Sequence, residues 1–135
     1  MEVTKILNGN EYVAVVYAPG FGAGWSTWGA ANATDGRIVN WLLEHYNYYI
    51  PTDEDAVEEG SIIRCGRYEG EVNEEEVKKL EKFCIEQCGY SSNQYYRGGR
   101  ELDIAWVKRG TRYHIEEYDG RETVREIDDS FWYTA

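Results

Sequence analysis

The chain has 135 residues and a formal net charge of −11, a length that predicts a single domain spanning residues 1–135. So negative a chain is not expected to bind nucleic acids through a basic face, because Lys and Arg contacts to phosphates supply most of that affinity. The sequence contains no apolar run long enough to cross a bilayer, and its first residues do not resemble a signal peptide. We therefore expect a cytoplasmic protein that binds neither nucleic acid nor membrane.

The N-terminal part predicts a strand followed by a glycine-rich loop. Residues 11–18, EYVAVVYA, are typical of a buried strand. The next segment, GFGAGWSTWG at residues 20–29, lacks the lysine and the spacing of a phosphate-binding loop, and Trp25 is bulky where a pyrophosphate would approach. Its glycines favour positive φ angles in a compact turn that places Trp25 and Trp28 in the core or in a subunit contact. A nest of N–H groups for an anion is the open alternative.

A first helix is predicted in the middle of the chain. Thr34 or Asp35 can cap it, and Pro51 ends it. Its apolar stripe consists of Ile38, Trp41, Leu42, His45 and Tyr49, which predicts a core position for His45. The acidic run at residues 52–60, TDEDAVEEG, is typical of an exposed loop rather than a metal site. Residues 61–67 predict a short strand.

A second helix has clear signals at both ends, with Asn73 as its cap, Glu76 in the position of a capping box and Gly89 at its end. Its core stripe consists of Val77, Leu80, Cys84, Ile85 and Cys88. Phe83 falls off the edge of this stripe. Its ring therefore either covers a neighbouring element or offers its face to another group.

Alternating residues in the last third predict strands at 101–107, 111–118 and 121–127, and a final strand at FWYTA, residues 131–135. Asp119-Gly120 is a strong hairpin signal. The predicted fold class is α+β, in which an antiparallel sheet, made of this C-terminal meander and the N-terminal strand, packs against two helices.

Positive charge gathers in one part of this acidic chain. Residues 97–125 hold seven of the 14 basic side chains but only six of the 25 acidic ones. The seven are Arg97, Arg100, Lys108, Arg109, Arg112, Arg121 and Arg125. They indicate either a local anion site or charge pairing across a solvated sheet face, and the residues alone leave both possibilities open.

The loop at residues 91–100, SSNQYYRGGR, is a candidate nucleotide-binding segment. Asn93 offers an amide, Tyr96 a stacking surface and Arg97 a guanidinium fork. An exposed connection between a helix and a strand would have a similar composition, so this hypothesis also remains open.

Catalytic and metal-binding patterns are missing from the sequence. Three cysteines and two histidines show neither zinc-site spacing nor the signature of a hydrolytic nucleophile. We therefore expect a binding protein rather than an enzyme, with no metal and no cofactor. A small cyclic-nucleotide hydrolase would need a base, a metal cluster or a nucleophile that the motifs do not supply.

Three segments together resemble a known family. GFGAGWSTWG near the N-terminus, RGTRYHIEEYDG at residues 109–120 and the closing FWYTA are similar to those of the first-described Thoeris anti-defence proteins. These phage "sponges" sequester cyclic ADP-ribose isomers made by bacterial TIR-domain enzymes. Because the motifs lie towards both ends, the resemblance covers nearly the whole chain.

The resemblance implies a protein that holds its ligand intact, in the host bacterial cytoplasm during infection. It implies a homo-oligomer built from dimers, a hexamer, with ligand pockets between protomers, and separate sites for cyclic oligonucleotides. It assigns Phe83 to stacking on adenine, Asn93 to hydrogen bonding, and Arg109 and Arg125 to the diphosphate. Tyr96 and Arg97, beside Asn93, complete the candidate ligand-binding set.

A different class of function fits the charge. An acidic phage protein can mimic nucleic acid and occupy the basic channel of a host defence protein. This alternative would make the net charge of −11 the functional feature rather than the clustered arginines.

Overall fold

A computed structural model of the protein describes residues 1–20, 24–28, 31–67, 74–90 and 102–127. Within these ranges the chain forms six strands and three helices, so the predicted α+β class is confirmed. The loop with Asn93, Tyr96 and Arg97 and the strand predicted at 131–135 lie outside the described residues.

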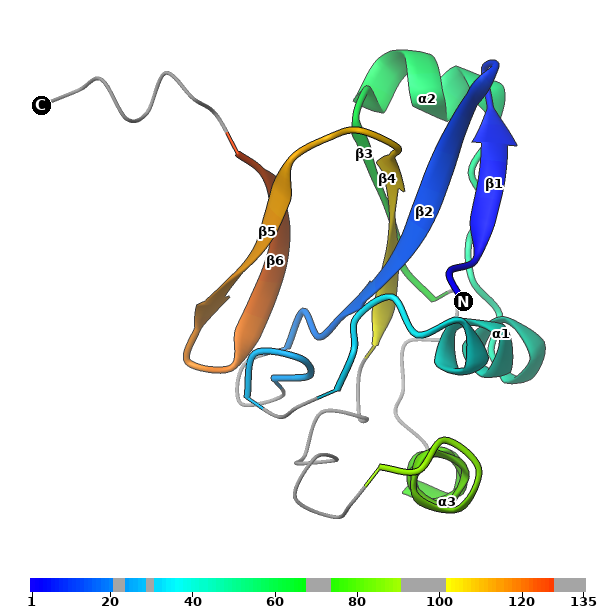
Figure 1. The fold of residues 1–135 in the computed structure, drawn as a ribbon, viewed down its shortest axis with the longest axis vertical. Helices are drawn as coiled ribbons and strands as arrows, with labels where there is room; N and C mark the ends of the chain where they lie inside the picture. The colour runs from blue at the N-terminus through cyan, green and yellow to red at the C-terminus, as the bar shows by residue number, and fades with distance from the viewer. Residues whose placement is uncertain (21–23, 29–30, 68–73, 91–101, 128–135) are drawn as a thin grey trace, which may run out of the picture.

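The main sheet is antiparallel and has the strand order β1-β2-β4-β3 (Figure 1). Its strands are β1 (Thr4–Leu7), β2 (Asn10–Tyr17), β4 (Asp103–Lys108) and β3 (Ile62–Cys65). β2 and β4 lie in the centre, with Val15 opposite Ala105. Alternate side chains of β2 contribute to two separate apolar clusters. Both faces of this strand are therefore covered, which explains its continuous apolar sequence.

β1 has no counterpart among the predicted strands. It joins β2 through a two-residue turn in which Asn8 and Gly9 both have positive φ angles, 51° and 78°. Asn-Gly suits this turn because both residues tolerate the left-handed region. The dipeptide between TKIL and NEYVAVVY was a usable sequence signal for the hairpin.

β5 (Tyr113–Tyr118) and β6 (Arg121–Glu126) form a separate two-stranded sheet, joined through Asp119 and Gly120 as predicted. The prediction of one continuous C-terminal meander is wrong, because β4 pairs with β2 and β3 instead of β5. An isolated two-stranded sheet is only marginally stable. This one packs its apolar side chains, Val124 with the partly buried Tyr113 and Ile115, against one face of the main sheet.

α1 (Gly36–His45) packs against the opposite face. Asp35 caps it as predicted, accepting a hydrogen bond from the Arg37 backbone N–H at 3.0 Å. The helix ends earlier than expected, because Tyr46 is already extended, so Tyr49 lies outside it. His45 is exposed, with its ring stacked on Trp41 at 4.0 Å, and its predicted core position is wrong.

The acidic run predicted to be a loop forms α2 (Asp53–Glu59). Thr52 Oγ1 accepts a hydrogen bond from Asp55 N, and Asp55 Oδ2 accepts one from Thr52 N at 2.8 Å. This is a capping box with Asp in the usual place of Glu, and the acidic first turn also suits the helix dipole. None of the helices in the described ranges is long and apolar enough to span a membrane.

The cap makes α2 sensitive to one hydroxyl group. We expect Thr52→Ala to lower the free energy of unfolding by about 1 kcal/mol, measured by urea denaturation. Thr52→Ser, which keeps the hydroxyl, serves as the matched control and should stay close to wild type. Equal losses in both variants would show that the methyl group, rather than the cap, matters.

Candidate functional site

Three of the six predicted site residues can be placed, and they lie on three different elements. Phe83 is in α3 (Glu74–Glu86), Arg109 follows β4, and Arg125 is in β6. α3 and the connection between β4 and β5 lie at opposite ends of the molecule (Figure 1). Phe83 and Arg109 of one chain therefore do not contribute to the same pocket.

Phe83 packs α3 against α1. Its half-buried ring stacks on Trp41 with 6.0 Å between centroids and 27° between planes. Leu80, Cys84 and Cys88 of the predicted stripe are buried, whereas Val77 and Ile85 are only partly buried. This contact gives Phe83 the first of the two roles left open, and the part of its side chain that stays exposed is still accessible to another group.

Arg109 ties the end of β4 to the N-terminal region. Its Nε donates to Glu11 Oε1 at 2.6 Å and its Nη1 to Glu2 Oε1 at 3.1 Å. These hydrogen bonds, chiefly the one to Glu11, raise the pKa of Arg109 further. The side chain is nevertheless 51% exposed. It borders a small cavity of about 160 Å³ between Glu2 and Tyr113, so an anion that reaches Arg109 must compete with two carboxylates.

Arg125 lies on the outer face of the β5–β6 hairpin. Its Nε is 2.5 Å from Glu116 Oε2, and His114 Nε2 is 3.2 Å from Glu116 Oε1. This face carries a shallow hollow of about 490 Å³ lined by Glu116, Glu117, Tyr118, Arg121, Thr123 and Arg125. Charge pairing on a solvated sheet face is thus present here. Such exposed pairs stabilise a fold little, so an incoming anion can replace Glu116.

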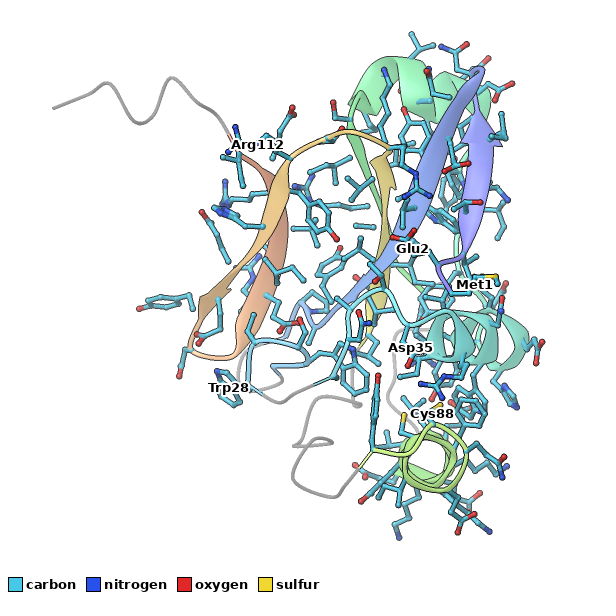
Figure 2. All side chains as sticks on the ribbon, viewed as in Figure 1. Met1, Glu2, Trp28, Asp35, Cys88 and Arg112 are labelled. Atoms are coloured by element: carbon cyan, nitrogen blue, oxygen red, sulfur yellow. The ribbon has the colours of Figure 1, made fainter. Side chains whose placement is uncertain are left out.

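The glycine-rich loop buries Trp25, which is 1% exposed, as predicted. Trp28 is half-buried beside the β5–β6 turn (Figure 2), where its Nε1 donates to Glu117 Oε1 at 3.0 Å. Gly24 does not have the positive φ angle expected of these glycines. A Cβ there would lie 2.4 Å from Trp28 Cγ, so glycine is required for close packing instead.

The same loop also forms a nest of N–H groups, and the anion in it is the carboxylate of Glu122. Ala18 N donates to Oε1 at 2.9 Å, while Trp25 N and Thr27 N donate to Oε2 at 3.0 and 2.9 Å. Thr27 Oγ1 adds a fourth donor at 2.6 Å. Glu122 is only 1% exposed. Glu122 was not among the predicted site residues, since a glutamate in an alternating strand resembles any solvated side chain.

The buried cysteines do not suit nucleophilic chemistry. All three are free thiols, and burial raises the pKa of both Cys65 and Cys84 to about 12. A neutral thiol is a poor nucleophile and a poor metal ligand. Across the described ranges, His, Cys, Asp and Glu side chains form no group of three that could hold a metal ion.

Glu122 should be essential for holding the loop. Replacing it with Gln places an amide among four donors and leaves some of the buried N–H groups unpaired, each costing roughly 1–3 kcal/mol. We expect Glu122→Gln to lower the free energy of unfolding by about 3 kcal/mol in urea denaturation. Glu126→Gln, on the same strand but exposed, is the control and should change it by less than about 0.5 kcal/mol. Similar values for both variants would contradict a structural role of the carboxylate.

Three features of the described residues bear on function: the half-exposed guanidinium groups of Arg109 and Arg125, the ring of Phe83 between two helices, and the nest filled by Glu122. A scan against models of protein families, and searches of curated proteins and of solved structures, found no match to this chain. Function is therefore inferred from the residues and their geometry.

Proposed function

We propose that the protein is a phage anti-defence protein that binds and sequesters cyclic ADP-ribose isomers in the host cytoplasm without degrading them. The observation that carries this proposal is the exposure of Arg109 and Arg125, which are 51% and 58% exposed and which, within the described ranges, are paired with carboxylates that an incoming anion can replace. Both lie in or next to the segments that resemble the sponge family. The proposal includes cyclic oligonucleotides as a second ligand class.

Replacement of the Glu116 carboxylate on Arg125 by a ligand anion favours a diphosphate as the ligand. Arg125 holds the Glu116 carboxylate through an exposed, charge-assisted contact. A phosphate oxygen offers the same kind of contact with more negative charge, and the guanidinium fork can bind it through two parallel hydrogen bonds. Replacement therefore keeps the arginine paired. A diphosphate brings two such groups close together, whereas a single chloride or carboxylate gains nothing over Glu116.

The positions of the predicted residues favour a pocket between copies of the chain. A sponge working at micromolar signal levels needs nanomolar affinity, about 12 kcal/mol of binding free energy. The two arginines cannot supply this without a stacked base, and α3, which carries Phe83, lies at the other end of the molecule from the β4–β5 connection that holds Arg109 (Figure 1). We therefore propose a homo-oligomer built from dimers, a hexamer, in which Phe83, Asn93, Tyr96 and Arg97 of one protomer meet the arginines of another.

A second candidate, inhibition of a host defence protein by mimicry of nucleic acid, is supported by two acidic helix starts. α2 begins with Asp53, Glu54 and Asp55, and α3 with Glu74, Glu75 and Glu76. Such clusters could enter a basic channel. This function would require a stable complex with a host protein and no affinity for small cyclic nucleotides.

Calorimetry with a panel of cyclic ADP-ribose isomers and cyclic oligonucleotides tests the proposal. We expect tight binding of at least one isomer, and recovery of the unchanged compound after the complex is heated. Arg109→Ala and Arg125→Ala should each weaken binding about tenfold or more, because each removes a charge-assisted hydrogen bond. Phe83→Leu should weaken it through loss of ring stacking, while keeping an apolar contact with Trp41.

Lys79→Ala, which removes an exposed cation on α3, is the matched control and should bind like wild type. If no isomer produced heat and a host protein co-purified, mimicry would replace the sponge proposal. Recovery of ADP-ribose or another product would show that the protein is an enzyme.

A further inference from the structure

The two long edges of the β5–β6 hairpin differ in how their backbone groups are used. Ile127 N donates to Arg112 O at 2.8 Å, and the register places these residues opposite each other. Hydrogen-bonded and non-bonded pairs alternate along an antiparallel ladder. The backbone groups of Tyr113, Ile115 and Glu117 on β5 therefore point away from β6. On β6, those of Glu122, Val124 and Glu126 point away from β5.

The outer edge of β6 is covered by the same chain. Glu122 N donates to Ala18 O at 2.7 Å, and the Val124 carbonyl accepts a hydrogen bond from the Arg64 guanidinium. Among the described residues, none covers the outer edge of β5. In the part of the chain that the structure describes, the outward N–H and C=O groups of Tyr113, Ile115 and Glu117 have no hydrogen-bond partner.

β5 carries two glutamates but lacks most of the other features that usually protect an open edge. Its six residues, YHIEEY, include no Pro, Gly or Lys, and its register with β6 is continuous, without a bulge. By contrast, the edge strands β1 and β3 are four residues long, and β1 carries Lys5. Natural proteins blunt their open edges in these ways because such edges pair readily with other strands. An edge protected by two glutamates alone can still pair with a strand that places an uncharged or complementary side chain opposite them.

We propose that β5 pairs antiparallel with β5 of a second copy of this chain, across a two-fold axis at Ile115. A two-fold contact uses the same surface on both copies, and one β5 edge offers the outward groups that the other needs. The homo-oligomer proposed above leaves the contact between copies undefined. This proposal names a contact surface and rests on the hydrogen-bond pattern of the hairpin, so it requires no ligand.

Three registers satisfy the rule that outward residues face each other, with Ile115 opposite Tyr113, Ile115 or Glu117 of the other copy. The first pairs only three residues of each strand. The third sets the two Glu116 carboxylates against each other, which destabilises the pair. The second pairs residues 113–117 and places His114 opposite the partner's Glu116 twice. Charge and length of pairing therefore select the register centred on Ile115.

The selected register also accounts for an exposed aromatic side chain. Tyr118 is 76% exposed and lies on the same face of the hairpin as His114 and Arg112. In the paired sheet it stands opposite the partner's Arg112, whose guanidinium can cover its ring. On the other face, Ile115 lies beside its own counterpart and extends the apolar row that begins with Val124.

The test combines oligomeric state with amide exchange on the full chain. Analytical ultracentrifugation should show wild type as a dimer or a multiple of dimers. His114→Glu opposes like charges at both ends of the pairing and should raise the dissociation constant about tenfold. The double variant His114→Glu with Glu116→His restores a His–Glu pair at both positions and should return the constant to near its wild-type value. Thr4→Glu, on the exposed side of β1, is the control for added charge and should have no effect.

Hydrogen exchange followed by NMR identifies the edge directly. In the assembled protein the amides of Tyr113, Ile115 and Glu117 should be protected, and this protection should disappear on dilution to monomers. The amides of His114, Glu116 and Tyr118, bonded within the hairpin, should stay protected in both states. Three results would each overturn the proposal. The first is a wild type that stays monomeric at about 100 µM. The others are an oligomer in which the Tyr113 and Ile115 amides are unprotected, and a dissociation constant that does not change in His114→Glu.

Discussion

The carboxylate of Glu122 ties β6 to the end of β2 and to the glycine-rich loop that follows it, which lie about 100 residues earlier in the sequence. Its two oxygens accept hydrogen bonds from the end of β2 and from the glycine-rich loop, while its own backbone N–H bonds the same β2 end. A buried carboxylate is costly unless it is fully hydrogen-bonded, and here four donors surround it. The arrangement fixes how the hairpin sits on the main sheet. It thereby also places β6, rather than β5, beside Ala18 at the end of β2.

Local sequence signals predicted much of the fold, because turns and caps depend on few residues. Asp119-Gly120 placed the hairpin, and Asp35 placed the start of α1. α2 was missed because its capping box uses Asp55, and a run of acids resembles a solvated loop. The pairing of β2 with β4 could not be predicted from the sequence, for another reason. These strands are separated by about 90 residues, and no local pattern specifies a partner at that distance.

In the candidate site, too, the contacts between residues that are far apart in the sequence could not be predicted. Periodicity correctly put Phe83 at the margin of its helix stripe, but it could not reveal that Trp41 of another helix faces the ring. Clustered cations were visible in the sequence, whereas the carboxylates that hold them come from distant residues such as Glu2 and Glu11. Glu122 was overlooked for a similar reason, since burial of a polar side chain depends on contacts across the fold.

Glu116 links the proposed ligand site to the proposed dimer contact. In one chain it accepts from Arg125 and contacts His114, and in the register centred on Ile115 it also faces the partner's His114. A phosphate that replaces Glu116 on Arg125 would leave this carboxylate free to pair across the two-fold axis. Ligand binding would then strengthen the dimer, and by thermodynamic reciprocity the dimer would bind ligand more tightly than the monomer. A sponge with this coupling would retain its signal best when assembled, because release would require loss of a contact on both sides of the axis.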